Sequence, residues 1–159
     1  MACVLFLGCG LWAATPASSD LTSASATLVN EVLFTLSGEA RTQRDMELYR
    51  DVLAEVFDKK RIGPYTKSLP EDFLLSQLAS REASAFDLQA EPPSLSTAQK
   101  KKLSAYPPEE LERQVRELSR AMALIEIKEN QLKQEPRFTS WVDLLKRKYQ
   151  LRVKSALYP

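Results

Sequence analysis

The chain has 159 residues, enough for one domain preceded by a leader, and its 22 lysines and arginines nearly balance 21 aspartates and glutamates. This balance gives no general attraction to nucleic acid or to an anionic membrane. The sequence contains no histidine, which excludes histidine-based acid–base catalysis, histidine triads and zinc sites with histidine ligands.

The N-terminus has the pattern of an export signal. Residues 4–14 (VLFLGCGLWAA) form an apolar run of signal-peptide length, too short to span a bilayer, and small residues follow in ATPASS. No lysine or arginine precedes this run, which departs from the usual pattern. We expect residues 1–19 to be a signal peptide and the mature protein to lie in the periplasm; a buried N-terminal helix is the alternative.

Both cysteines lie inside this leader, so cleavage would leave a mature chain without thiols or disulfides. Cys9 allows a second interpretation, because Phe6-Leu7-Gly8-Cys9 loosely matches a bacterial lipoprotein box. In that case Cys9 would be acylated and would anchor the mature protein to the membrane. Phenylalanine is unusual at the first place of such a box.

The first elements of the mature chain are a strand and a capped helix. Residues 32–36 are β-branched or bulky, which predicts a strand, and Ser37-Gly38 breaks it. Thr42 stands three residues before Asp45, close to a capping box, and apolar residues at helical spacing follow up to Phe57.

Two longer helices and a connector follow. A second helix is expected to begin at Pro70 and to continue toward Leu88. Residues 91–108 contain four prolines and predict a connector, with room for a short helix around residues 96–105. A third helix opens at Pro107-Pro108 with an apolar stripe and ends at residues 134–136.

The C-terminal part predicts a short helix and a last strand. Phe138, Trp141, Val142 and Leu145 have helical spacing, and Tyr149 to Val153 alternate between apolar and polar residues. We therefore predict a mainly α fold, one domain over residues 20–159. Its two short terminal strands, 32–36 and 149–153, should pair, because an isolated strand leaves its backbone groups unsatisfied.

Three segments together resemble the N-terminal chaperone domain of the SurA/PpiD/trigger-factor-like envelope folding factors. They are VLFTLSGE at 32–39 followed by TQRDM at 42–46, LLSQLASREA at 74–83, and the F-x-x-W-x-x-x-L-x-x-K-Y-x-L pattern of residues 138–151. The similarity covers most of residues 29–153. Each motif consists mainly of core and capping residues, so the specificity lies in their order and spacing.

The resemblance implies a helical chaperone domain without catalysis. Many members of the family carry a parvulin-type prolyl isomerase domain, which uses histidines and about a hundred further residues, a normal domain size. This chain has neither, so we expect no enzyme activity, no catalytic residue, no metal site and no cofactor.

The leading hypothesis is an exported protein that binds unfolded or partly folded envelope proteins, including outer-membrane clients. Such binding needs an exposed apolar groove with adaptable walls and a polar rim. Each candidate wall residue has an ordinary core role as its alternative. The candidates are Tyr65, Phe73, Phe86, Tyr106 and Met122.

Two other functions stay open. The long third helix and a basic tail suit a structural or assembly subunit that binds one envelope partner. The five tail cations, near Trp141 and Tyr149, also suggest binding to an anionic surface or nucleic acid, although strand alternation would place Arg152 and Lys154 on a solvated face. Export argues against nucleic acid, and we expect membrane contact only if Cys9 is lipidated. The tail cations are Lys146, Arg147, Lys148, Arg152 and Lys154.

Overall fold

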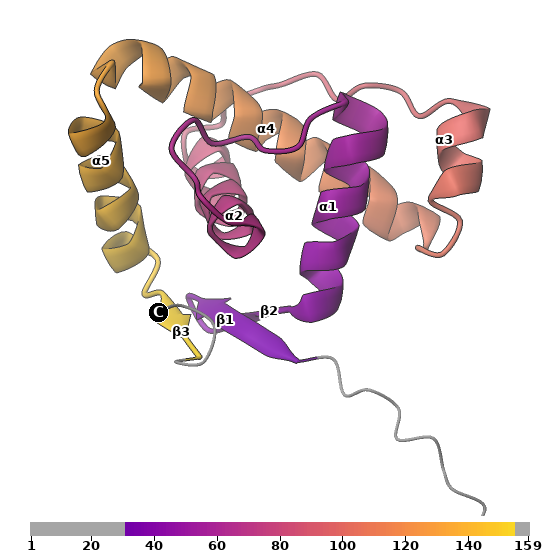
Figure 1. Cartoon of the computed structure of the whole chain (residues 1–159), viewed down its shortest axis with the longest axis horizontal. Helices are drawn as coiled ribbons and strands as arrows, with labels where there is room; N and C mark the ends of the chain where they lie inside the picture. The colour runs from indigo at the N-terminus through magenta and orange to yellow at the C-terminus, as the bar shows by residue number, and fades with distance from the viewer. Residues whose placement is uncertain (1–30, 155–159) are drawn as a thin grey trace, which may run out of the picture.

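A computed structural model describes residues 31–154 as five helices and three short strands, which confirms the prediction of a mainly α fold (Figure 1). The predicted signal peptide and Cys9 lie outside the described residues. The elements are β1 (Val32–Leu36), β2 (Glu39–Thr42), α1 (Gln43–Phe57), α2 (Leu69–Ala85), α3 (Thr97–Lys102), α4 (Pro108–Leu132), α5 (Glu135–Lys148) and β3 (Arg152–Val153).

The strands form one antiparallel sheet in the order β2-β1-β3. Phe34 of β1 pairs with Val153, and Thr35 pairs with Arg152. The Lys154 N–H donates to the Leu33 carbonyl at 3.2 Å and extends this pairing by one bond. The predicted pairing between the first and last strands of the domain is thereby confirmed.

The second strand was not predicted from the sequence. Ser37 and Gly38 form a two-residue turn with φ values of 50° and 85°, both positive as a type I′ hairpin requires. The chain therefore returns as β2 alongside β1 before α1 begins. Ser37-Gly38 does break the first strand, but it does so as a hairpin turn.

The predicted strand at 149–153 is wrong over its first part, because that part terminates α5. Gln150 is left-handed, with φ 48°. The Gln150 N–H donates to the Arg147 carbonyl at 3.2 Å, and the Leu151 N–H donates to the Lys146 carbonyl at 2.9 Å. These two bonds form a Schellman motif, so only Arg152–Val153 remain as strand.

The same kind of ending shortens α2 relative to its prediction. Asp87 is left-handed, with φ 51°, and the Leu88 N–H donates to the Ala83 carbonyl at 2.8 Å. The helix ends at Ala85, three residues before the predicted Leu88. At the other end its N-cap is Ser68, with Pro70 in the first turn.

The capping box at the start of α1 forms as predicted. The Asp45 N–H donates to the Thr42 Oγ1 at 3.3 Å, and the Thr42 N–H donates to the Asp45 carboxylate at 2.8 Å. The short helix expected in the connector is also present, as α3. Its Gln99 amide donates to the Glu55 carbonyl at 2.8 Å, which fixes the connector to α1.

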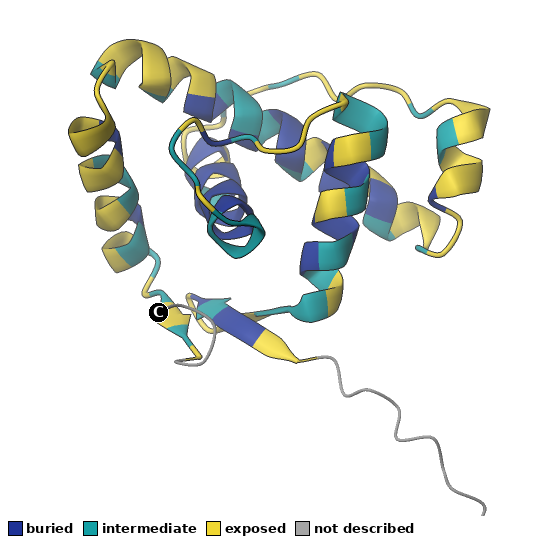
Figure 2. Cartoon of the chain, in the orientation of Figure 1, coloured by how far each residue is buried: buried dark blue, intermediate teal, exposed yellow. Residues whose placement is uncertain are grey.

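Helix α2 is the centre of the molecule. Figure 1 shows it nearly end-on, framed by α1, α4, α5 and the sheet. Residues 72–80 are all buried, polar ones included, whereas the surrounding helices each bury one face (Figure 2). A helix enclosed in this way places its polar side chains inside the molecule, where each needs a partner.

Candidate functional site

A groove lies between α2, α5 and β3, with the loop that precedes α2 along its side. We call it the α2–α5 groove, and its volume is about 440 Å³. Leu74, Leu75 and Phe138 form a buried floor. Half-buried apolar side chains line its walls: Tyr65, Val142, Leu151 and Val153.

The rim of the groove is charged and carries both signs. Lys67 and Glu71 stand on the side of α2, and Glu135 and Lys146 stand on α5. The Lys67 N–H donates to the Glu71 carboxylate at 2.8 Å, which holds one edge of the rim in place. The groove thus combines an apolar floor with a polar border, as binding of apolar side chains from water requires.

Aromatic rings in edge-to-face contact support the groove beside α5. The rings of Tyr65 and Phe138 meet edge-on, with centroids 5.4 Å apart. Phe138 and Trp141 have the same geometry at 5.2 Å. Such edge-to-face contacts are favourable for aromatic side chains, so they stabilise this wall.

The buried carboxylate of Asp72 holds the loop that carries Tyr65. It has no exposed surface, and it accepts bonds from the Gly63 N–H at 2.9 Å and the Thr66 hydroxyl at 2.7 Å. The Tyr49 hydroxyl donates to it at 2.5 Å. Burial and the Asp72 charge both raise the pKa of Tyr49, which therefore remains a donor.

Gly63 is needed where this loop crosses α2. A Cβ on Gly63 would stand 2.5 Å from the Leu75 Cδ2 atom and 2.7 Å from the Thr66 Cγ2 atom. Only a residue without a side chain allows this approach. The loop, and with it the tyrosine wall of the groove, is therefore placed by a glycine and an aspartate.

The five candidate residues do not meet at one site. Of these, Tyr65 lines the groove, whereas Phe73 is fully buried in the core and offers no surface to a ligand. Phe86 follows α2 and is 67% exposed, and the Tyr106 hydroxyl donates to Asp51 at 2.7 Å. Met122 is half-buried on α4.

The other lining residues of the groove were assigned from sequence to helix stripes or to the last strand. Phe138, Val142 and Leu151 were recognised as apolar positions, but nothing local indicates that α5 lies beside α2. That neighbourhood depends on contacts between segments about 65 residues apart, such as the Lys148 amine donating to Glu82 at 2.6 Å.

Most cations of the basic tail have partners in the molecule. Lys146 pairs with Asp143 at 2.9 Å and Lys154 with Glu31 at 2.9 Å. Lys148 pairs with Glu82 at 2.6 Å, and the Tyr149 hydroxyl donates to the same carboxylate. Burial alone would raise the pKa of Glu82, but the two hydrogen bonds and the charges of Lys148 and Lys128 together outweigh burial and lower the pKa.

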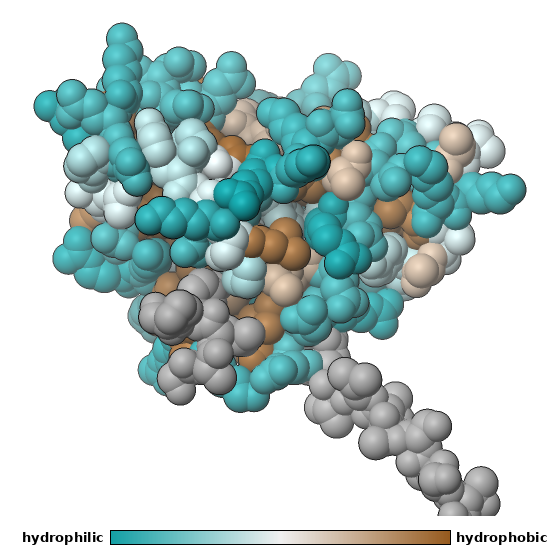
Figure 3. Space-filling model, viewed as in Figure 1, coloured by the Kyte–Doolittle hydropathy of each residue, from teal (hydrophilic) through white to brown (hydrophobic). Residues whose placement is uncertain are grey.

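On the face shown in Figure 3, hydrophobic side chains surface only in small areas framed by hydrophilic ones. Within residues 31–154, no cluster of cysteine, aspartate or glutamate could hold a metal ion. No helix in this part of the chain has the length and apolar character needed to cross a membrane.

Comparison with known proteins adds no relative. No protein-family model, no curated protein and no solved structure matches this chain. The geometry of the chain's own residues is therefore the basis for a functional assignment.

Proposed function

We propose that this chain is a non-catalytic, exported, chaperone-like protein that binds unfolded or partly folded envelope proteins. The α2–α5 groove is the observation that carries the proposal. Its floor of Leu74, Leu75 and Phe138 would take up apolar side chains of an extended client. The resemblance of the sequence to SurA-like folding factors supports the same function.

The groove suits weak and broad recognition. Burial of apolar surface contributes about 25 cal/mol per Å² and has little directional preference, so many apolar sequences would fit. Ordering a flexible client offsets much of this gain. We expect dissociation constants in the micromolar range, about 8 kcal/mol of binding free energy.

Suppression of aggregation tests the proposal. An unfolded outer-membrane protein is diluted from denaturant with and without a molar excess of this protein, at low and at high salt. We expect suppression at both salt concentrations, because apolar burial is not screened by ions. Lack of suppression would favour an assembly subunit with one partner, and loss of suppression at high salt would favour the basic tail as the binding site.

A pair of neighbouring substitutions on α5 assigns the activity to the groove. Thr139 is an exposed lining residue, so Thr139→Arg places a long charged side chain over the groove without disturbing the core. Ser140 is also exposed but is not among the lining residues, which makes Ser140→Arg the matched control. We expect Thr139→Arg to weaken suppression and Ser140→Arg to leave it unchanged; equal effects would exclude the groove.

Export is the second part of the proposal and rests on the sequence of residues 1–19. Mass spectrometry or N-terminal sequencing of the protein from the cell envelope should give a first residue between Thr15 and Asp20, or an acylated Cys9. Recovery of the chain from the cytosol with Met1 retained would contradict export.

A further inference from the structure

The two edges of the small sheet differ in how open they are. The strand order β2-β1-β3 makes β2 and β3 the edge strands, and each pairs on one side only. Unpaired backbone groups along such an edge can accept a further strand. The surroundings of each edge decide whether it is available.

On the outer edge of β3 the backbone of Val153 is open. The Lys154 N–H donates to the Leu33 carbonyl, and bonded and non-bonded positions alternate along an antiparallel pair, so Val153 is at a non-bonded position. Its N–H and carbonyl therefore point away from β1, and within the described part of the chain neither group has another hydrogen-bond partner. Two residues earlier α5 closes this edge, because the Leu151 N–H donates to the Lys146 carbonyl.

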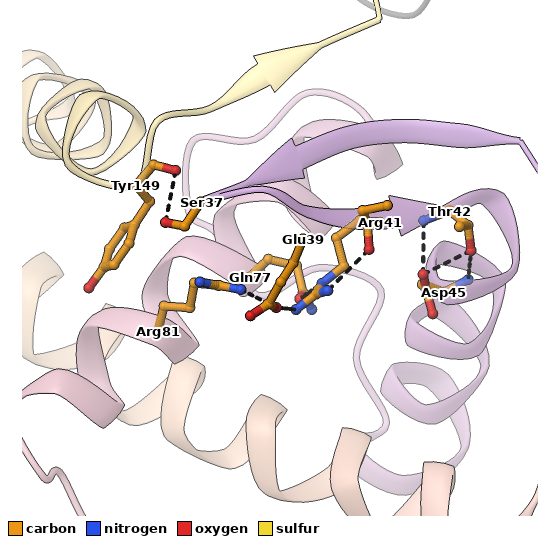
Figure 4. A network of polar contacts seen from close by, with 9 residues as sticks. Ser37, Glu39, Arg41, Thr42, Asp45, Gln77, Arg81 and Tyr149 are labelled. Atoms are coloured by element: carbon orange, nitrogen blue, oxygen red, sulfur yellow. Dashed lines mark hydrogen bonds and ion pairs between the residues drawn. The ribbon is translucent and has the colours of Figure 1, made fainter.

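The outer edge of β2 is obstructed by charged side chains. The two-residue turn makes Leu36 and Glu39 a bonded pair, so the backbone of Ala40 faces outward. The Arg41 guanidinium donates to the Ala40 carbonyl at 3.2 Å. Figure 4 shows Glu39 and Arg41 extending from β2 toward α2. Charged side chains on an edge oppose pairing with a further strand, so β3 is the more available edge.

The open edge of β3 borders the α2–α5 groove. Leu151 and Val153 are two residues apart, so their side chains share one face of the strand, and both line the groove. A strand added beside Val153 would place every second side chain on that same face, above the floor residues Leu74 and Phe138. The backbone edge and the apolar floor would then bind the same segment.

The charges along the groove suit an uncharged segment. Two cations, Lys67 and Lys146, and two carboxylates, Glu71 and Glu135, line it. Because these charges balance, an acidic or a basic segment would meet no net opposite charge. Apolar side chains match the floor.

We propose that the groove binds an uncharged, extended segment of its client, which pairs with Val153 as an additional strand and directs alternate apolar side chains into the groove. The strand pairing rests on the proposed chaperone function and specifies the conformation of the bound segment. Val153 offers one donor and one acceptor, and each backbone bond contributes about two- to tenfold to affinity after exchange with water.

Exchange of backbone amides with water, measured by NMR, tests the pairing. The probe is a capped peptide in which three valines alternate with three threonines, between a lysine and a glutamate. At a peptide concentration about ten times the dissociation constant, we expect the Val153 amide to exchange about tenfold more slowly, because only the free protein is open there. The Ala40 amide at the other edge is the internal control and should keep its rate.

Slower exchange at Ala40 alone, or at neither position, would overturn the pairing. If the protein then still suppresses aggregation, the proposed function stands without strand pairing; if it does not, both proposals fail. Slow exchange of the Val153 amide before peptide is added would show that the chain itself or a second copy covers this edge, which would also overturn the proposal.

Two proline substitutions make the same change at the two edges. Val153→Pro removes the outward N–H of β3 and no bond to β1, and edge positions of this kind tolerate proline. We expect it to weaken peptide binding about two- to tenfold. Ala40→Pro is the matched control and should leave binding unchanged. Equal affinities of the two variants, each with a melting transition that shows it to be folded, would contradict a bond to the Val153 N–H.

Discussion

At the scale of single residues, Asp72 links three parts of the molecule through one side chain. Its carboxylate contacts Tyr49 of α1, the Ile62–Gly63 backbone and Thr66 of the loop. A carboxylate with several donors is stable in the interior because each lone pair is satisfied. The sequence gives no signal for this role, since Asp72 also suits the first turn of a helix by charge.

Replacement of Tyr49 by phenylalanine should destabilise the protein by about 1.5–3 kcal/mol, the usual contribution of a hydrogen bond to a buried charge. The ring would continue to pack against Phe73, with the two centroids 5.3 Å apart. The loss of stability would therefore measure the contribution of the Tyr49 hydroxyl. Denaturant unfolding of the variant gives this free energy.

Tyr106→Phe is the matched control, because Tyr106 also donates to an aspartate but is only half-buried. We expect a loss below about 1 kcal/mol there, since water replaces the missing partner. Equal losses in the two variants would show that burial of Asp72 does not strengthen its bond to Tyr49.

At the scale of elements, helix starts were predicted better than helix ends. Ser and Thr caps and first-turn prolines mark a start in the sequence, as at Thr42 and Pro70. The ends use left-handed residues that are not glycine, at Asp87 and Gln150. Without glycine the Schellman motif has no clear sequence signature, which is why α2 was predicted too long and β3 to begin too early.

Gln150→Gly should stabilise the protein by about 0.5–1 kcal/mol, because glycine adopts the left-handed conformation without the penalty of a Cβ. Gln150 is exposed, so no packing is lost. The midpoint of denaturant unfolding measures the gain. As a control, Asn130→Gly inside α4 should lower stability by about 0.3 kcal/mol, because a helix interior gains nothing from glycine. Gln150→Gly that is no more stable than the wild type would contradict a left-handed penalty at Gln150.

The contact between α2 and α5 should depend on pH through Glu82. Its pKa in the folded protein lies below the ordinary value of 4.5, so the unfolded chain binds more protons in acid. Its contribution to stability is complete above pH 4.5 and is lost as the pH falls through the lowered pKa. Glu82→Gln should therefore reduce the free energy of unfolding by about 1–3 kcal/mol at pH 7 and by much less near pH 3. Melting temperatures measured at both pH values should fall in the same order.

Glu112→Gln serves as the reference for that experiment. Glu112 is exposed and its ion pair with Arg116 is 4.0 Å long, so we expect a change within about 0.5 kcal/mol at either pH. A Glu82 variant that behaves like the Glu112 variant at pH 7 would contradict the role of Glu82 in joining the two helices.

At the scale of the whole molecule, the sequence predicted the helical class and the pairing of the terminal strands. It did not predict that α2 is enclosed, because its polar residues Gln77 and Glu82 would normally mark a solvent face. Their partners, Arg41 and Lys148, come from segments far along the chain. The groove depends on the same long-range packing, which explains why only Tyr65 of its walls was proposed in advance.

Removal of β3 should destabilise the domain strongly. A chain that ends at Gln150 loses β3, one of the two partners of β1, and the partly buried Leu151 and Val153 that pack on the core. We expect a loss of several kcal/mol, a large share of a typical stability of about 5–15 kcal/mol. A chain that ends at Lys154 is the control, and the difference in unfolding free energy between the two reports β3. Equal stabilities would mean that β3 does not support β1.

The pairing of β1 with β3 also sets how the domain responds to tension. Because the strands are antiparallel, the entry point of the domain at Glu31 and its exit at Lys154 are neighbours, 2.9 Å apart at their charged ends. A force applied through the two flanking segments would open the ladder one bond at a time, from Lys154 toward Arg152, and would not shear all its bonds together. Under such a force, the β1–β3 pair would separate first at the end where Glu31 and Lys154 lie.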